Sequence, residues 1–414
     1  MTEYSDVVII GGGQAGLAIG YYLSQQKRDY IILEKAPFLA SAWRSRWDSF
    51  TLVTPSWSLN LPDLPPTDAD PDGFLTREEV VTYLEDFAAT YNPKIRFGVE
   101  VSSVEQVKGK SSYLLNTSGG SIEANNVVVA TSTYQQPRIP DFAEEIPAEI
   151  DQLHTSEYQK PGALKDGGIL VVGTGQSGCQ IAEELYLSGR KVYLCVGTSP
   201  RAPRRYRGKD TTWWMNKMGL FDQTVDKLPS PKNRFNPSIH VSGKDGGRTL
   251  NLHQFARDGV VLLGHLTAVQ DTSITIAPDL HNTLKAVDHF ADELLAGIDM
   301  FIEKSGLPAD ERSIKSHLDD GYTTKIVRQL DLKDEGINTI IWATGYSFDF
   351  SWIKLALLDE YGYPIQQRGV TKYPGLYFLG LLWLHTAKSS LLAGVGDDAA
   401  YLANIIAAEQ KDEG

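Results

Sequence analysis

The 414-residue sequence predicts an α/β protein that contains two Rossmann-type βαβ units. Its length exceeds the size at which one hydrophobic core stops growing, so we expect more than one domain. Two G-x-G-x-x-G loops, Gly11–Gly16 and Gly173–Gly178, each stand between an apolar β-branched run and apolar residues at helical spacing. No other internal repeat is visible, as expected after duplication of a dinucleotide-binding fold.

The first glycine loop follows the buried-strand run Asp6–Ile10. In this setting Gly11 permits the tight turn, Gly13 lets the backbone approach a pyrophosphate, and Gly16 lets the helix pack close to the strand. The next predicted strand ends in Glu34, where a carboxylate accepts both ribose hydroxyls of FAD or NAD. A generic βαβ turn is the alternative interpretation, and Glu34 makes it the weaker one.

The second glycine loop follows the run Gly168–Val172 and has the same order of elements. Its second strand, Lys191–Val196, ends without a carboxylate, and the chain continues into Arg201, Arg204 and Arg205. A missing acid beside arginines favours a 2′-phosphate, so the sequence predicts NADPH rather than NADH, bound by at least one of these arginines. A solvated basic loop is the alternative.

Composition excludes several classes of function. The formal net charge of −13 and the pI near 5.1 argue against a nucleic-acid partner. Neither a signal peptide nor an apolar stretch of membrane-spanning length is visible, so we expect a cytoplasmic protein without a membrane partner. Cys179 and Cys195 are too far apart for a CxxC redox pair, and both are interpreted as small buried hydrophobes. The histidines show no metal-binding spacing, and no metal is expected.

Further motifs accompany the two loops in a fixed order, and together they resemble the flavin-containing monooxygenases and their bacterial and plant relatives. The segments that carry this resemblance are Ala40–Arg44, Thr76–Leu84 with a capping box from Thr76 to Glu79, Val127–Thr133, Ile340–Tyr346, Pro374–Gly380 and Leu391–Ala399. The resemblance thins between about residues 206 and 333.

The resemblance implies a nicotinamide domain inserted into a discontinuous FAD domain. The implied boundaries are 1–162 for the first FAD part, 163–335 for the NADPH domain with a helical and loop insertion, and 336–414 for the second FAD part. Helices are predicted over Thr211–Leu220 and Lys285–Lys304, and the apolar stripe of the latter is interpreted as core or as a homodimer surface. The stretch Asp226–Gly247 is interpreted as a lid or a surface excursion.

One family fingerprint is only half kept. The family pattern FxGxxxHxxxY corresponds here to Ala148–Tyr158, in which His154 and Tyr158 match but Ala148 and Ile150 replace the phenylalanine and glycine. His154 is therefore interpreted either as an ordinary linker histidine or as a cofactor-facing residue.

The resemblance implies an enzyme in which NADPH reduces FAD, and a C4a-(hydro)peroxyflavin then oxidises a small organic nucleophile, at nitrogen or sulfur, or a carbonyl. The alternatives are an FAD-dependent NAD(P)H oxidase or reductase without oxygen transfer, and a redox-sensing flavoprotein. No side chain is assigned as catalytic, because the cofactor carries the chemistry. The predicted cofactor-binding residues are Gly11, Gly13, Gln14, Ala15, Gly16, Glu34, Lys35, Trp43, Arg44, Thr54, Val101, Ala130, Thr131, Ser132, Gly173, Thr174, Gly175, Gln176, Ser177, Gly178, Arg201, Arg204, Arg205, Ala343, Thr344, Gly345, Tyr346, Gly396 and Asp397.

Overall fold

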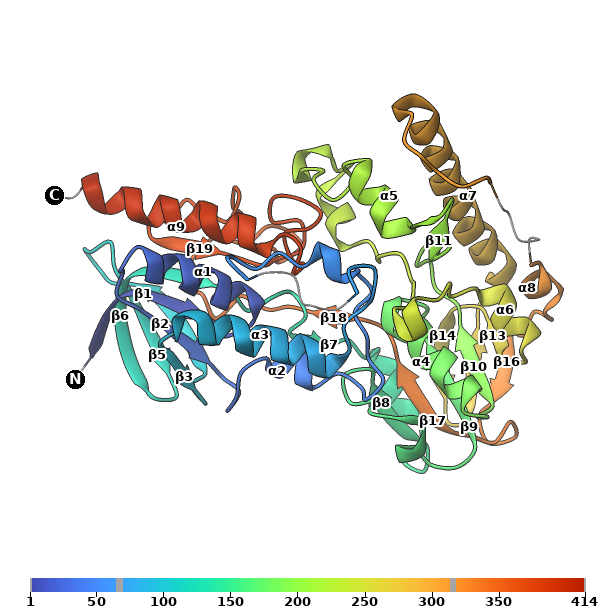
Figure 1. Ribbon diagram of the computed structural model, residues 1–414. Helices are drawn as coiled ribbons and strands as arrows, with labels where there is room; N and C mark the ends of the chain where they lie inside the picture. Colours follow the sequence, from blue (N-terminus) through green and yellow to red (C-terminus); the bar gives the residue numbers. More distant parts are fainter. Residues whose placement is uncertain (1, 65–69, 313–317, 413–414) are drawn as a thin grey trace.

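The computed structural model describes residues 2–64, 70–312 and 318–412 and divides into two α/β units, which we name the first and second domains (Figure 1). The first domain is built on a seven-stranded sheet with the order β3-β2-β1-β6-β5-β4, in which β19 also pairs with β6. These strands are β1 (Glu3–Ile10), β2 (Tyr30–Glu34), β3 (Ile95–Phe97), β4 (Val101–Gln106), β5 (Tyr113–Thr117), β6 (Gly120–Val129) and β19 (Leu376–Phe378).

Strand β6 lies at the centre of this sheet and pairs with two strands along one of its edges. Its first half pairs antiparallel with β5, and its second half pairs parallel with β19, which arrives from the far end of the chain. Its other edge pairs with β1 over the whole length. The predicted apolar runs of β1 and β6 are buried on both faces, as is typical of a parallel sheet covered by helices.

The α-helices that the structure describes in the first domain are α1 (Gln14–Gln25), α2 (Ser41–Arg44), α3 (Arg77–Tyr91) and α9 (Val395–Asp412). Helix α1 packs against both α3 and α9. The predicted capping box is present at α3, where the Thr76 backbone N–H donates to Glu79 Oε2 (2.8 Å) and the Glu79 N–H donates to Thr76 Oγ1 (3.3 Å).

The second domain is built on a five-stranded parallel sheet with the order β13-β10-β9-β17-β8. Its strands are β8 (Asp151–His154), β9 (Gly168–Val172), β10 (Val192–Cys195), β13 (Val261–Leu263) and β17 (Ile337–Trp342). Two of its helices are α4 (Gln176–Leu187) and α6 (Leu252–Arg257).

An insertion extends the second domain on the right of Figure 1, where α5 and α7 lie above the sheet. Its elements are β11 (Arg205–Tyr206), β12 (Lys209–Asp210), α5 (Thr211–Lys217), β14 (Leu266–Gln270), β15 (Ser273–Ile276), α7 (Leu280–Ser305), α8 (Asp320–Thr323) and β16 (Gln329–Asp331). Short 3-10 helices cover Ser56–Ser58, Asp141–Glu145, Pro161–Ala163, Val225–Lys227, Pro231–Phe235 and Lys244–Gly246. Thus α7 begins five residues before its prediction, and α5 ends three residues earlier than predicted.

Sheet pairing moves the predicted domain boundaries. Strands β8 and β17 pair with each other in the second sheet, so residues 151–154 and 337–342 belong to the second domain. The chain crosses between the domains at β7 (Gln136–Pro137) and β18 (Tyr346–Ser347), which pair antiparallel. The predicted boundaries at 162 and 335 differ from this division by sheet pairing, in which β8 and the return strand β17 complete the second sheet.

The two domains also interlock beside this crossover. Trp47 of the first domain is 3% exposed and packs in a core cluster of the second domain with Tyr158. The backbone N–H of Asp48 donates to Gln159 O (2.9 Å). Among the described residues, no helix is long and apolar enough to cross a membrane.

Candidate cofactor-binding sites

The first glycine loop has the geometry that a nucleotide-binding turn requires. Gly11 has a φ of +108°, and a Cβ there would lie 2.6 Å from Ala130 O at the end of β6. A Cβ on Gly16 would lie 1.9 Å from Gly11 O. Neither position therefore accepts a side chain, since the loop, β6 and α1 are in direct contact.

Gly13 differs from Gly11 and Gly16 because the space where a side chain would lie is open. A Cβ on Gly13 would meet no atom within 4 Å, and the residue directly precedes α1. The backbone N–H groups at the start of a helix bind anions, so this open face fits a pyrophosphate. Glu34 accepts the N–H groups of Gly12 (2.7 Å) and Ala36 (2.8 Å), which hold its carboxylate beside the loop. These residues fit an FAD nucleotide.

The chain that follows β19 closes over the same loop. Gly380 has a φ of +74°, and a Cβ there would lie 2.7 Å from the Cβ of Ala15. Gln14 Nε2 donates to Ser390 O (2.8 Å). Asp397, in the first turn of α9, forms an ion pair with Lys388 (3.0 Å). The structure thus brings Gln14, Ala15 and the start of α9 together, and Gly380 is a position that sequence reasoning did not single out.

Two residues that were predicted to contact the flavin bind carboxylates of the first domain. The Arg44 side chain is exposed, binds Glu85 of α3 and donates to Leu39 O (3.1 Å). Lys35 is exposed and pairs with Glu100 (3.3 Å). By contrast, Trp43 is half-buried, with its ring centroid 6.0 Å from that of Phe50. The Val99 N–H donates to Glu34 O (3.0 Å). This hydrogen bond brings the start of β4 at Val101 close to the end of β2.

The second glycine loop repeats the first. Gly173 has a φ of +108°, and a Cβ there would lie 2.7 Å from Ala343 O at the end of β17. A Cβ on Gly178 would lie 2.1 Å from Gly173 O, whereas a Cβ on Gly175 would meet nothing within 4 Å. Because each loop packs against the end of the strand beside it and leaves its middle glycine open, the second loop also fits a nucleotide pyrophosphate.

Hydrogen bonds from two side chains of the second loop hold the neighbouring segments in place. Thr174 Oγ1 accepts the N–H of Gly197 (2.9 Å) and donates to Gly197 O (3.1 Å), which joins the loop to the end of β10. Gln176 donates through Nε2 to Val241 O and accepts the Val241 N–H (3.1 Å). Part of the stretch predicted as a lid or surface excursion is therefore held against the start of α4.

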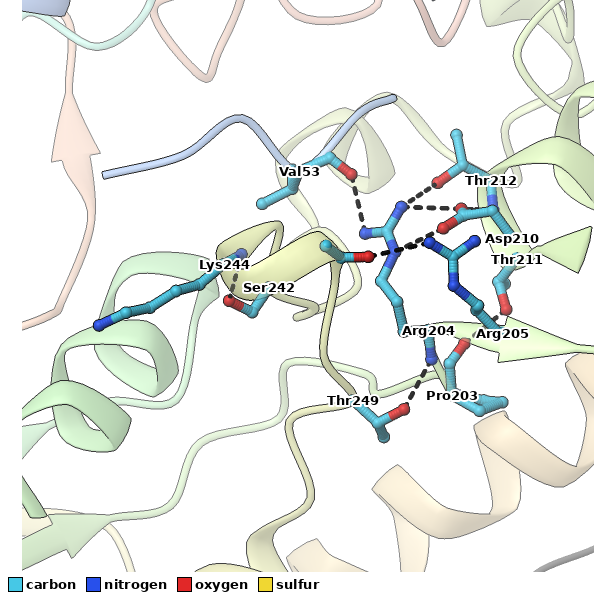
Figure 2. Close-up of polar contacts among 11 residues, drawn as sticks. Val53, Pro203, Arg204, Arg205, Asp210, Thr211, Thr212, Ser242, Lys244 and Thr249 are labelled. Carbon is cyan, nitrogen blue, oxygen red and sulfur yellow. Dashed lines mark hydrogen bonds and ion pairs between the residues drawn. The ribbon is translucent and has the colours of Figure 1, made fainter. Parts of the chain in front are cut away.

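The three candidate arginines occupy different environments. Figure 2 shows the Arg204 guanidinium enclosed by its partners. It is 2% exposed, binds both carboxylate oxygens of Asp210 (2.6 and 2.7 Å), and donates to Val53 O of the first domain (2.9 Å). Its guanidinium also lies 4.3 Å from the ring centroid of Phe74. This placement argues against Arg204 as a phosphate ligand, since its hydrogen bonds already join the two domains.

The other two arginines are more accessible. Arg201 follows β10 and uses Nε to bind Asp288 (2.7 Å), while its side chain remains 12% exposed. Arg205 is exposed and donates to Gly246 O (2.9 Å). Both remain candidates for a 2′-phosphate.

His154 lies at the crossover between the domains. It is fully buried, its Nε2 lies 2.9 Å from Gly345 O, and its Nδ1 lies 2.9 Å from Ser156 Oγ. Its ring stands edge-on to Tyr346, with centroids 4.8 Å apart. Burial lowers the pKa of His154, although the hydrogen bond to Gly345 O opposes this shift. These contacts favour the linker interpretation, because the polar atoms of the ring are already used.

Neither cysteine is available for redox chemistry at a flavin. Cys179 lies in α4 and Cys195 ends β10, and both are buried. Burial raises the pKa of the Cys195 thiol to about 12 and also raises the pKa of Cys179. Within the described ranges, no group of three His, Cys, Asp or Glu residues could hold a metal ion.

A family model described as pyridine nucleotide-disulphide oxidoreductase matches residues 8–217. A CzcO-like oxidoreductase of Geobacillus kaustophilus is 36% identical over 98% of this chain and 99% of its own length. The chain belongs to this oxidoreductase family. Indole-3-pyruvate monooxygenase YUCCA1 of rice is 28% identical over 92% of this chain and 87% of its own length. A flavin-containing monooxygenase from Stenotrophomonas maltophilia has the same fold, with 19% identity, 99% coverage of both chains and a TM-score of 0.67.

These relatives confirm the predicted resemblance to the flavin monooxygenases and the predicted α/β fold with two nucleotide-binding domains. The protein is an oxidoreductase of this family, as the sequence predicted, and solved structures with the same fold are a flavin monooxygenase and a cyclohexanone monooxygenase bound to NADP⁺.

Proposed function

We propose that this protein is an FAD-dependent monooxygenase that uses NADPH and molecular oxygen in the cytoplasm. The observation that carries the proposal is the matched geometry of the two glycine loops, each with an open middle glycine, in domains joined by a two-stranded crossover. The monooxygenase names of the rice and Stenotrophomonas relatives support the oxygen-transfer step. The proposed substrates are small organic nucleophiles that react at nitrogen or sulfur, or carbonyl compounds.

The first domain would hold FAD. The loop from Gly11 to Gly16 would bind its pyrophosphate, and Glu34 would accept the hydroxyls of its ribose. Gly380 lets the closing chain lie against α1, while the first N–H groups of α9 would stabilise negative charge on the flavin pyrimidine. When bound, the flavin supplies hydride acceptance and oxygen activation as a C4a-(hydro)peroxyflavin. The residues of the protein would bind and orient the cofactors and the substrate, and they would exclude water from the site.

The second domain would hold NADPH. The loop from Gly173 to Gly178 would bind the pyrophosphate, and Arg201 or Arg205 would bind the 2′-phosphate. Arg201 lies six residues beyond the end of β10, the strand whose end normally contacts the adenosine ribose. Replacing either arginine by methionine tests this assignment through the ratio of KM values for NADPH and NADH. Replacing the arginine that binds the 2′-phosphate should bring this ratio of KM values close to one. An unchanged ratio in both variants contradicts the assignment.

A second candidate function is an NAD(P)H oxidase or reductase that reduces oxygen to hydrogen peroxide. The half-kept fingerprint favours it, since Ala148 and Ile150 replace family residues and His154 faces the crossover. A disulfide reductase is disfavoured, because both cysteines are buried in the second domain.

Stopped-flow spectroscopy separates the two candidates. Holoenzyme reduced by one equivalent of NADPH is mixed with oxygenated buffer, and the flavin spectrum is followed. A monooxygenase should give a long-lived spectrum of the C4a-(hydro)peroxyflavin type before oxidised flavin returns. Direct return of oxidised flavin, with one hydrogen peroxide per NADPH, would support the oxidase instead.

A further inference from the structure

Arg46 of the first domain has no counter-ion in the described part of the chain. Its side chain is half-buried, and its Nε is buried without a hydrogen-bond partner. The guanidinium lies 5.8 Å from the ring centroid of Phe50, and no carboxylate among the described residues pairs with it. Arg77, which is also half-buried, by contrast pairs with Asp48 (3.1 Å). The chain has 52 Asp and Glu residues against 39 Lys and Arg residues, so carboxylates outnumber the basic side chains.

The backbone of Arg46 is fixed although its charge is unpaired. Its N–H donates to Trp43 O (3.1 Å), and its carbonyl accepts a hydrogen bond from Arg77 Nη1 (2.8 Å). The next residue, Trp47, is anchored in the core of the second domain. The backbone of Arg46 is therefore fixed by the first domain, next to a residue that is anchored in the second.

Arg46 lies next to the contact between the domains at Trp47, and its charge acts on two groups at the crossover. It lowers the pKa of His154, adding to the effect of burial, and it opposes the rise in the pKa of the Tyr134 phenol that follows from partial loss of water. The rings of Tyr134 and Tyr346 are in edge contact, with centroids 5.6 Å apart. Next to Tyr134, the Thr133 hydroxyl is buried and also has no hydrogen-bond partner.

A buried guanidinium Nε without a hydrogen-bond partner is costly, and an oxyanion bound to the guanidinium would remove this cost. The planar donors of a guanidinium match phosphate and carboxylate oxygens, often through two parallel bonds. We propose that Arg46 binds an oxyanion at the crossover, either a phosphate group of the nicotinamide nucleotide or a carboxylate of the substrate. The inference rests on the proposed function as an NADPH-dependent monooxygenase, and it adds a positively charged subsite beside the crossover.

The test measures binding to the oxidised holoenzyme, which needs no oxygen chemistry. Isothermal titration with NADP⁺, inorganic pyrophosphate and benzoate is done for the native protein, R46M and R46K. The control is R328M, which removes the same charge from an exposed arginine outside the crossover. Because Arg46 has no ion pair to lose, R46M should keep the melting temperature of the native protein.

If the ligand group is a phosphate, R46M should weaken NADP⁺ and pyrophosphate binding by about 10- to 100-fold, as expected for a charged hydrogen bond. If it is a carboxylate, R46M should weaken only benzoate binding by a similar factor. R46K should recover part of the lost affinity, and R328M should match the native protein. Unchanged affinity of R46M for all three probes overturns the proposal. Such a failure would leave the monooxygenase proposal standing, since that proposal is tested by oxygen kinetics.

Discussion

Replacing Arg204 by methionine tests whether this arginine stabilises the domain junction or binds NADPH. The substitution leaves the Asp210 carboxylate buried, with a remaining hydrogen bond from the Thr212 N–H (2.8 Å). Breaking one side of a buried ion pair costs about 3–5 kcal/mol, because the other charge stays uncompensated. At about 2–4 °C per kcal/mol for a domain of roughly 200 residues, the melting temperature should fall by about 6–20 °C.

The assay is differential scanning calorimetry of the holoenzyme, with Arg205→Met as the matched control. Arg205 is the exposed neighbour, and its single bond to Gly246 O predicts a stability change within about 0.5 kcal/mol. Asp210→Asn provides a second variant, which leaves Arg204 unpaired and should also lower the melting temperature. The reasoning is refuted if Arg204→Met melts like the native protein and instead loses its preference for NADPH.

Three further predictions concern the nucleotide loops, a buried histidine and the cysteines. Gly178→Ala places a Cβ 2.1 Å from a backbone oxygen of its own loop and should abolish NADP⁺ binding in titrations while FAD remains bound, whereas Gly175→Ala should fold normally. Burial lowers the pKa of His240 to about 3, so the unfolded chain binds the proton first, and stability should fall by about 1.4 kcal/mol per pH unit below about 6.5. His240→Asn should flatten the melting temperature measured between pH 7.5 and 5, and an equal slope in both proteins contradicts this origin. Because burial raises the pKa of Cys195 to about 12, and also that of Cys179, iodoacetamide at pH 8 should label neither thiol until the protein unfolds, as read by mass spectrometry. Rapid labelling of the native protein would revive the disulfide-reductase alternative.

Local features were predictable from sequence because their causes are local. The order of strand, glycine loop and helix fixes which glycines contact backbone, and Gly11 and Gly173 have the same φ for the same reason. The capping box from Thr76 to Glu79 likewise depends on residues three positions apart. The carboxylate of Glu34 follows from its place at the end of a strand.

Long-range partners were not predictable from the same patterns. Arg204 looked like its neighbours in a basic loop, but it binds Val53, which lies 151 positions earlier in the chain. The family resemblance directed attention to Arg44, which pairs with Glu85, whereas Arg46 adjoins Trp47 at the contact between the domains. Helix α2 spans only four residues, so two residues at adjoining turns of this segment point in different directions. The spacing in the sequence does not determine which of the two arginines points into the protein.

Isotope labelling with ¹⁸O₂ tests the proposed function most directly. NADPH-reduced holoenzyme is mixed with ¹⁸O₂ and a panel that contains a thioether, a tertiary amine and a cyclic ketone, and the products are read by mass spectrometry. A monooxygenase predicts at least one product with a single ¹⁸O atom, formed at the expense of one NADPH. Recovery of all NADPH equivalents as labelled hydrogen peroxide, with every panel member unchanged, would contradict oxygen transfer.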